Sequence, residues 1–275
     1  MNGIIVVDKK KGNTSFDEIR EIRKKYNTKK VGHIGTLDPM ATGVLPILIG
    51  EATKLSDYLM GHDKEYVATL KLGQKMDTGD SEGSIVLEKP IPILSEEKIK
   101  EVLSSFLGKS NQIPPMYSAI KVNGKKLYEL AREGKEIERE AREIEIYAIE
   151  LIKIKEEDNI VKEIEFKVNC SKGTYIRVLC EDIAKKLGTC GYMSELRRTR
   201  VGNFTLKDTN KLLTIEEVMK DKDTYSLKEN ELKKLLNGVK IQTVLKDGLV
   251  RIYNNHDFIG IGEVKNNMLK RKIIL

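Results

Sequence analysis

The sequence predicts a protein of the α+β class, with a large mixed region up to residue 226 and a smaller β-rich region over 227–275. In the first region, segments that alternate apolar and polar residues, as half-buried strands do, are interspersed with segments whose apolar residues recur at helical spacing. Beyond it, short strands punctuated by glycine are expected. A chain of 275 residues can bury a substantial core and form one large and one small domain.

The composition indicates a globular protein with a polyanionic partner. Charged residues make up 33% and hydrophobic residues 40%, which excludes intrinsic disorder, and the net charge of +7 suits a nucleic acid. Three cysteines without C-x-x-C spacing indicate neither a disulfide framework nor a zinc site, so we expect a reducing compartment. No segment has the pattern of a signal peptide or membrane span, and we therefore expect a cytoplasmic protein with no membrane partner.

Local patterns predict the elements of the first hundred residues. Residues Ile4–Val7 read as a short buried strand, followed by a helix in which Ser15 and Glu18 fit a capping box. Residues Lys64–Leu72 alternate strictly and predict a half-buried strand. Over 73–83, acids lie among glycines without the spacing of a calcium-binding loop, which indicates a polar hairpin-type loop of open chemical role.

The later elements follow from the same reasoning. The patterns predict an amphipathic helix over 95–107, a hairpin of strands 144–154 and 160–168 around Asp158-Asn159, and helices that end at Gly188 and Met219. Short strands are expected at Val239–Val244, Leu249–Tyr253, Phe258–Val264 and Met268–Leu275.

The stretch from Gly32 to Gly50 is the strongest candidate for a functional loop. It holds four glycines and two prolines in nineteen residues, which excludes a regular helix. Pro39 restricts Asp38 to extended geometry, and an apolar run follows that can anchor the loop in a core. A rigid loop that presents one carboxylate suits catalysis, although an Asp before Pro is also a common turn former.

Three motifs carry a resemblance to a known family. Gly-His-Ile-Gly-Thr-Leu-Asp-Pro at 32–39, followed by Ala-Thr-Gly-Val-Leu-Pro at 41–46, resembles the signature loop of the TruB-type tRNA pseudouridine synthases. Lys-Gly-Thr-Tyr-Ile-Arg at 172–177 and Leu-Arg-Arg at 196–198 resemble two further elements of that family. The resemblance covers nearly the whole chain, with one local departure at Lys10, where the family usually has proline.

The resemblance implies a catalytic group and its supports. It makes Asp38 the catalytic residue, with Arg177 paired to it and Tyr66 stacked on the target uracil as a candidate for proton transfer. A guanidinium beside a desolvated carboxylate favours the ionised form, so the pairing makes physical sense. Without the resemblance, the sequence favours a core residue at Tyr66 and an ordinary helix-start arginine at Arg177. Whether Asp38 acts as nucleophile or as base stays open.

Further residues are implied to contact the RNA. By resemblance, Tyr175 and Leu196 line the nucleoside pocket, and His33 fills the place that a flipped uridine leaves in the RNA loop. A basic segment over 112–142, interleaved with tyrosines, resembles the thumb insertion of the family and suits a nucleic-acid clamp, although a solvated helix face is the alternative. The residues expected at the RNA backbone are Lys9, Lys121, Lys125, Lys126, Arg132, Arg197 and Arg198.

The resemblance implies an architecture and a reaction. We expect a pseudouridine-synthase-type catalytic domain over 1–226, on a mixed, largely antiparallel sheet with flanking helices, and a small PUA-like RNA-binding β-barrel over 227–275. The expected reaction isomerises uridine 55 in the T arm of tRNA to pseudouridine, in a monomer without an obligate protein partner. No cofactor or metal is implied, and the sequence has no P-loop, dinucleotide fingerprint or metal-ligand spacing. The alternatives are a non-catalytic tRNA-binding or tRNA-folding protein and a synthase for another uridine.

Overall fold

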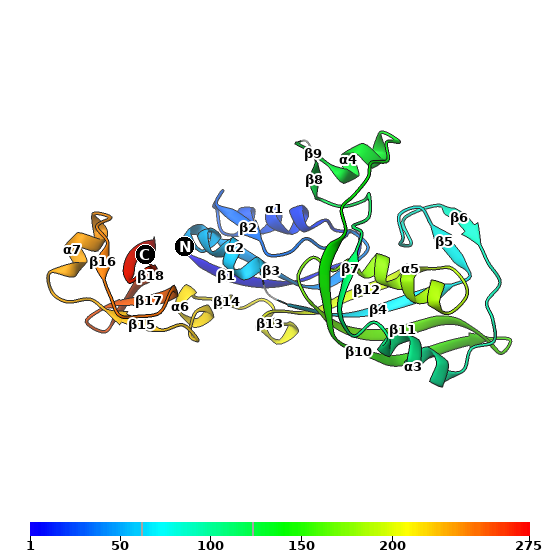
Figure 1. Ribbon diagram of the computed structural model, residues 1–275. Coiled ribbons are helices and arrows are strands. Elements are labelled where there is room, and N and C mark those ends of the chain that lie inside the picture. Colours follow the sequence, from blue (N-terminus) through cyan, green and yellow to red (C-terminus); the bar gives the residue numbers. More distant parts are fainter. Residues whose placement is uncertain (62, 123) are drawn as a thin grey trace.

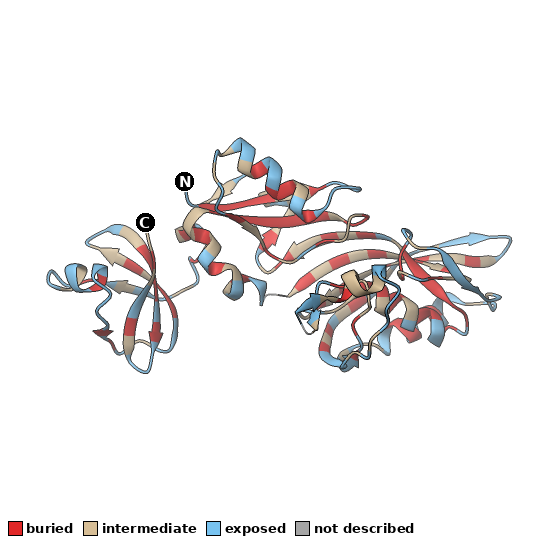
Figure 2. Ribbon diagram, turned by 90° about the horizontal axis from the view of Figure 1, so that it is seen from above, coloured by how far each residue is buried: buried red, intermediate tan, exposed pale blue. Residues whose placement is uncertain are grey.

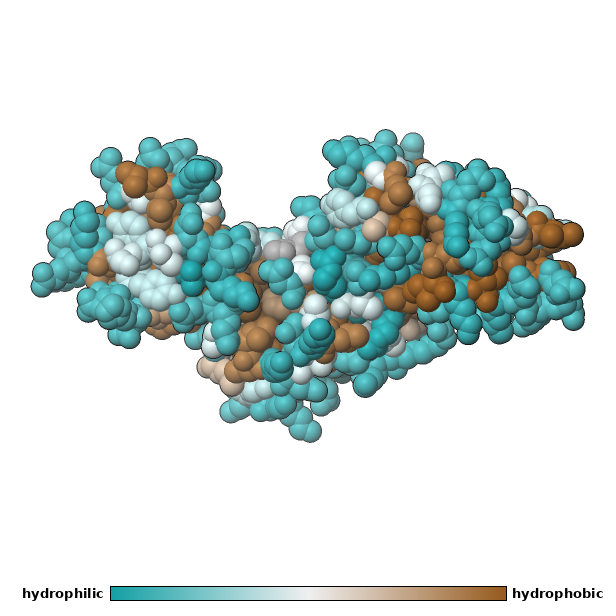
Figure 3. Space-filling view, turned by 90° about the horizontal axis from the view of Figure 1, so that it is seen from below, coloured by the Kyte–Doolittle hydropathy of each residue, from teal (hydrophilic) through white to brown (hydrophobic). Residues whose placement is uncertain are grey.

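The computed structural model describes residues 1–61, 63–122 and 124–275. The molecule is elongated (Figure 1): one large sheet with helices packed along it forms the main body, and a small sheet stands at the end near both termini. A short helix and two short strands project from the main body as the expected thumb. Figure 3 shows one long side of the molecule, on which the C-terminal sheet forms a separate lobe.

The large sheet is mixed and mostly antiparallel, which confirms the expected architecture. Among the described residues of its main path, only β3 and β12 are parallel neighbours. In spatial order the strands are β14 (Leu212–Leu213), β1 (Gly3–Lys9), β3 (Thr42–Ile49), β12 (Gly191–Val201), β4 (Lys64–Leu72), β11 (Ile160–Cys170), β10 (Arg142–Glu157) and β7 (Gly108–Gln112), with β2 (Val31–His33) beside β3 and β13 (Phe204–Thr205) beside β12.

Two apolar clusters cover the two faces of this sheet. On one face, Ile19 of α1, Ile99 of α3 and Ile183 of α5 pack against alternate residues of the strands, such as Phe166. On the other face, the 3₁₀ helix η1, α2 and α6 cover the end formed by β1 and β3. Figure 2 shows the alternation of buried and less buried residues along the strands of the large sheet. The helical elements are α1 (Ser15–Lys25), η1 (Gly50–Leu55), α2 (Ser56–Met60), α3 (Glu96–Ser104), α4 (Leu127–Arg132), α5 (Ile176–Lys186), η2 (Leu206–Asp208), α6 (Ile215–Val218) and α7 (Glu231–Leu236).

The small C-terminal sheet is curled and has five strands. Their order is β15 (Thr224–Ser226), β17 (Gly248–Asn254), β18 (Asp257–Lys265), β19 (Met268–Ile274) and β16 (Ile241–Gln242). Three of its apolar side chains, Leu249, Ile261 and Ile273, join the cluster under β1 and β3 rather than the sheet's own cluster. Two more pairs of short strands stand apart from both sheets: β5 (Gln74–Met76) with β6 (Ile85–Glu88), and β8 (Lys121–Val122) with β9 (Lys125–Lys126).

Several local predictions are confirmed and one is wrong. The strand Lys64–Leu72 has the predicted bounds, and Asp158 and Asn159, with φ of +53° and +59°, form the turn of the β10–β11 hairpin. The capping box of α1, however, is made by Thr14 and Asp17, not by Ser15 and Glu18. Ser15 is buried instead, and its hydroxyl bonds the backbone of the loop that carries Asp38.

We expect Phe166→Ala to lower the free energy of unfolding by about 3–5 kcal/mol, because the ring is fully buried in the main core and its removal leaves a cavity. Ile152 on the same hairpin is 50% exposed, so Ile152→Ala is the matched control and should change stability by about 0.5 kcal/mol or less. Urea unfolding measures both. Equal losses in the two variants would contradict the assigned core.

Candidate active site

The loop that carries Asp38 joins β2 to β3, and side chains from β1 and α1 hold its backbone in place. The Ser15 hydroxyl donates to the carbonyl oxygen of Leu37 at 3.1 Å and accepts from its N–H at 2.9 Å. The Lys9 ammonium donates to the Pro39 carbonyl oxygen at 3.1 Å. Gly35, with φ of +73°, makes the turn that other residues rarely adopt. Asp38 is therefore held between anchored neighbours.

Arg177, at the start of α5, forms the ion pair with Asp38. Its Nε lies 3.2 Å from Oδ2 of Asp38, and its side chain is only 6% exposed. The other guanidinium nitrogens donate to the carbonyl oxygens of Thr78 at 3.0 Å and Tyr117 at 2.7 Å, and Nη1 lies 3.6 Å from Oδ2 of Asp80. Carboxylates and carbonyls thus hold the guanidinium on three sides, and its position is fixed before any ligand binds.

Two opposing effects act on the Asp38 carboxyl. Burial raises its pKa, and the Arg177 guanidinium opposes that rise, while the second carboxylate at Asp80 adds to it. The side chain nevertheless keeps 37% of its surface exposed, because it faces a pocket. An anionic oxygen in a largely desolvated site, with one face open, can act on a bound substrate.

That pocket, of about 270 Å³, brings together five of the six residues that the sequence assigned to catalysis or base binding, all except His33. Tyr66 and Leu196 come from adjacent strands of the sheet, and Tyr175 directly precedes α5. Burial raises the pKa of the Tyr66 phenol, so its hydroxyl keeps its proton at neutral pH. The lining residues include Asp38, Lys64, Tyr66, Ser118, Tyr175, Arg177, Leu196 and Arg198.

The structure places His33 apart from this lining. It is half-buried in β2, opposite Ile47 of β3, and its Nδ1 has no hydrogen-bond partner among the described residues. Burial and the nearby Arg198 lower the pKa of the imidazole, which keeps the ring neutral. A neutral, partly apolar ring suits contact with a base more than contact with a phosphate.

Two of the cations that the sequence assigned to the RNA backbone do not fit that assignment. Lys9 and Arg198 are fully buried, and their nitrogens donate to backbone carbonyl oxygens of the chain itself. Arg197 is 40% exposed but binds the Asp8 carboxylate with two nitrogens, at 3.1 and 3.0 Å. A basic residue in a strand can neutralise backbone dipoles as well as phosphates, and the sequence alone does not separate the two.

The cations of the thumb lie at the surface. Lys121, Lys125 and Arg132 are exposed, and Lys126 is half-buried. The Lys126 ammonium and the Arg132 guanidinium lie 5.2 and 5.5 Å from the centre of the Tyr128 ring. The thumb therefore presents charge around an aromatic ring, as a nucleic-acid contact does.

Sequence reasoning missed three residues of the site. The resemblance placed the loop of Asp80 near the active cleft and left its role open, because the contact of Asp80 with Arg177 depends on a fold that the sequence does not show. Lys64 was placed only as a strand start; it is buried in the pocket, and burial lowers the pKa of its ammonium to about 8. Ser118 is buried, and its hydroxyl has no partner among the described residues.

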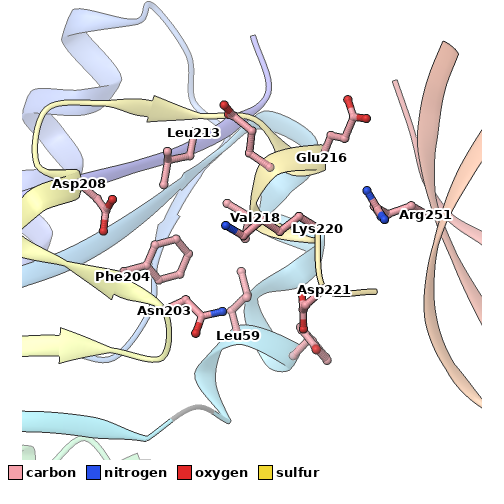
Figure 4. Close-up of a pocket in the computed structure, with 12 residues that line it drawn as sticks. Leu59, Asn203, Phe204, Asp208, Leu213, Glu216, Val218, Lys220, Asp221 and Arg251 are labelled. Carbon is pink, nitrogen blue, oxygen red and sulfur yellow. The ribbon is translucent and has the colours of Figure 1, made fainter. Parts of the chain in front are cut away.

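A second pocket, of about 490 Å³, lies between the main body and the C-terminal sheet (Figure 4). Arg251 reaches from β17 towards Glu216 of α6 across its opening. These two charged groups have partners: Glu216 accepts from the Tyr253 hydroxyl at 2.6 Å, and Arg251 donates to the Lys222 carbonyl oxygen at 3.1 Å. Phe204, Leu213 and Val218 supply apolar walls, and the remaining lining is largely charged.

Comparison with known proteins identifies the family. The model for the N-terminal domain of the TruB family pseudouridylate synthases matches residues 23–176, more than half of the chain. The chain belongs to the TruB family. Models for a tRNA pseudouridylate synthase B C-terminal domain and for a TruB C-terminal domain of pseudouridine synthase II match residues 177–241 and 225–273. As a pseudouridine synthase the chain is an isomerase.

Curated relatives match over nearly their whole length. The tRNA pseudouridine synthase B of Clostridium tetani is 45% identical over 281 residues, 96% of each chain. That of Francisella tularensis subsp. novicida is 43% identical, over 99% of this chain and 94% of its own. Among solved structures, a Cbf5–Nop10–Gar1 complex has a chain with a TM-score of 0.69 and 26% identity, matched over 99% of this chain and 84% of its own. A chain in an H/ACA ribonucleoprotein bound to a substrate RNA containing 2′-deoxyuridine has the same TM-score and shares the fold at 23% identity, over 99% of this chain and 84% of its own.

The described residues also bear on membranes and metals. None of the described helices is long and apolar enough to cross a membrane. Within the same residues, no three or more His, Cys, Asp or Glu side chains gather as metal ligands would.

The raised pKa of Asp38 predicts that the ionised Asp38 carboxylate lowers the free energy of unfolding. Below its ordinary pKa of 3.8 the group is protonated in both states; as pH rises through the higher folded-state pKa, stability is lost. We therefore expect Asp38→Asn to unfold at higher urea than the wild type at pH 7 and at the same urea near pH 3.

The exposed Asp223 gives the control, because Asp223→Asn should change the urea midpoint little at either pH. An Asp38→Asn variant less stable than the wild type at pH 7 would show that the ion pair with Arg177 outweighs burial.

Proposed function

We propose that the chain converts uridine 55 in the T arm of tRNA into pseudouridine, with Asp38 as the catalytic residue. The observation that carries the proposal is the Asp38 carboxylate, held 3.2 Å from a buried guanidinium at the edge of a pocket of about 270 Å³, in a member of the TruB family. The curated relatives named tRNA pseudouridine synthase B support tRNA as the substrate.

The reaction breaks the N1–C1′ bond of the uridine, turns the uracil, and bonds its C5 to C1′; C5 then loses its proton, and N1 ends protonated. Substrate and product are isomers, so the atoms balance without a redox partner. A base stacked in RNA cannot reach the pocket, and the uridine must be flipped into it. Asp38 then acts on the ribose or the base as nucleophile or general base, and Arg177 keeps it ionised.

The pocket walls account for the binding of the base. Tyr66 offers a flat ring for stacking and a hydroxyl for proton transfer, and Tyr175 and Leu196 complete the cradle. His33, beside the pocket, fills the gap that the flipped uridine leaves in the RNA loop. The thumb cations and the C-terminal sheet hold the rest of the T stem-loop, in a monomer that works in the cytoplasm.

Pseudouridine formation on an unmodified tRNA transcript, mapped to the nucleotide in the presence of EDTA, tests the proposal. We expect product at position 55 with the wild type. Asp38→Asn should retain tRNA binding and lose turnover by a factor of about 10⁴ or more, because the reacting charge is gone. Product at another position would keep the reaction and overturn the substrate. Tight binding without any product would instead favour a tRNA-folding protein.

The thumb predicts a salt-dependent effect on binding. We expect the double variant Lys121→Ala/Lys125→Ala to weaken tRNA binding and to reduce the slope of log Kd against log salt by about 1 for each lysine–phosphate interaction that the substitutions remove. Lys98 and Lys100 on α3 have exposed side chains, at 51% and 58%, and Lys98→Ala/Lys100→Ala is the matched control. Equal slopes of log Kd against log salt for the two double variants would show that the thumb lysines do not contact the tRNA.

A further inference from the structure

Arg198 is a buried charge that the proposed reaction does not use. Its side chain lies in the central strand β12 with none of its surface exposed. In the described part of the chain, backbone carbonyls and the more distant Asp38 compensate the guanidinium, and no carboxylate is paired with it. Burial of a guanidinium without a paired anion is unfavourable, so its retention calls for a role.

The contacts of Arg198 lie at the two ends of the Asp38 loop. Its Nε donates to the Val44 carbonyl oxygen at 2.8 Å, after Asp38, and its Nη2 donates to the Gly35 carbonyl oxygen at 2.9 Å, before it. One planar group thereby joins both ends of the loop. The bonds are fixed in direction because a guanidinium donates in a rigid fork.

The loop also approaches Arg198 as closely as glycine permits. Gly43 pairs with Arg198 between parallel strands, and a Cβ at Gly43 would lie 2.1 Å from the Arg198 carbonyl oxygen. A Cβ at Gly35 would lie 3.2 Å from Nη1. Gly43 thus makes room for the backbone of residue 198, and Gly35 makes room for the Arg198 guanidinium.

On its other side, Arg198 is the direct cross-strand neighbour of Tyr66 on β4. Neighbours in this register have side chains on the same face of the sheet. The guanidinium interacts with the Tyr66 hydroxyl and favours its ionised form. Arg198 therefore contacts both the loop of the carboxylate and the phenol.

We propose that Arg198 is a positioning residue that fixes the Asp38 loop relative to Tyr66. This inference rests on the proposed function, and it explains why a cation that resembles an RNA contact in sequence is fully buried. Without the guanidinium, the loop ends lose their common donor and the phenol loses its charged neighbour. The tRNA contacts at the outer surface remain, because Arg198 is fully buried and lines only the pocket.

Single-turnover pseudouridine formation, tRNA affinity and thermal unfolding of Arg198→Met and Arg198→Lys test this role. We expect Arg198→Met to slow the single-turnover rate at saturating enzyme by about 100-fold or more, as misplaced reacting groups do, with Kd for tRNA changed less than about twofold. Arg198→Lys keeps the charge but not the fork, and should recover part of the rate.

Arg200, on the same strand, is the matched control. It also donates to a backbone oxygen, at Gly202, but touches neither the loop nor Tyr66. Arg200→Met should change the rate little. Combining Arg198→Met with Tyr66→Phe should slow the reaction less than the product of the two separate effects, because the residues act together.

Two results would overturn the inference: folded Arg198→Met with the wild-type rate, or a loss of tRNA affinity that accounts for the whole effect. If Arg198→Met does not fold, an Arg198→Lys variant that reacts at the wild-type rate would also overturn the inference. The wild type is assayed alongside. An inactive wild type refutes the proposed function, whereas an active wild type with active Arg198 variants refutes this role alone.

Discussion

The rest of the active site depends on the ion pair between the Arg177 guanidinium and the Asp38 carboxylate, because the surrounding structure must supply partners for a buried cation. A buried cation needs a partner for each side of its fork, and Arg177 finds them in Thr78, Tyr117 and Asp80 as well as in Asp38. These partners lie on the loop after β5 and at the root of the thumb. The ion pair that favours the ionised form of Asp38 therefore also requires these separate segments to lie next to Arg177.

The basic residues around the active site differ in how deeply they are buried. Lys9 and Arg198 lie wholly inside and hold the loop by its carbonyl oxygens, whereas the thumb cations stand at the surface. The number of basic residues in the sequence is therefore larger than the number of cations that can contact RNA at the surface. Both interior cations favour the ionised form of Asp38. Burial, and after it the charge of Arg198, lowers the pKa of His33 and Lys64. Rigidity and electrostatics thus come from the same side chains.

Local signals allowed much of the fold to be predicted, and non-local contacts limited the rest. Strict alternation marked the strand that carries Tyr66, and Asp158-Asn159 marked a hairpin, because both patterns act within a few residues. Thr14-x-x-Asp17 and Ser15-x-x-Glu18 fit the same capping pattern, and only the contact of Ser15 with Leu37 decides between them. Motif resemblance located Asp38 and Arg177, but the burial of Arg198 depends on carbonyls from another strand.

The first strand of the chain has consequences for biosynthesis. β1 is made early, yet its edge is closed by Leu212 and Leu213, and Ile4 and Val6 belong to the same apolar cluster as Leu249, Ile261 and Ile273 of the C-terminal sheet. While the ribosome is still translating, these apolar side chains remain uncovered. The catalytic region can complete its packing only after the last strands leave the exit tunnel. Folding of the enzyme is thereby tied to synthesis of nearly the whole polypeptide, and prematurely terminated chains retain an exposed apolar face that chaperones can bind.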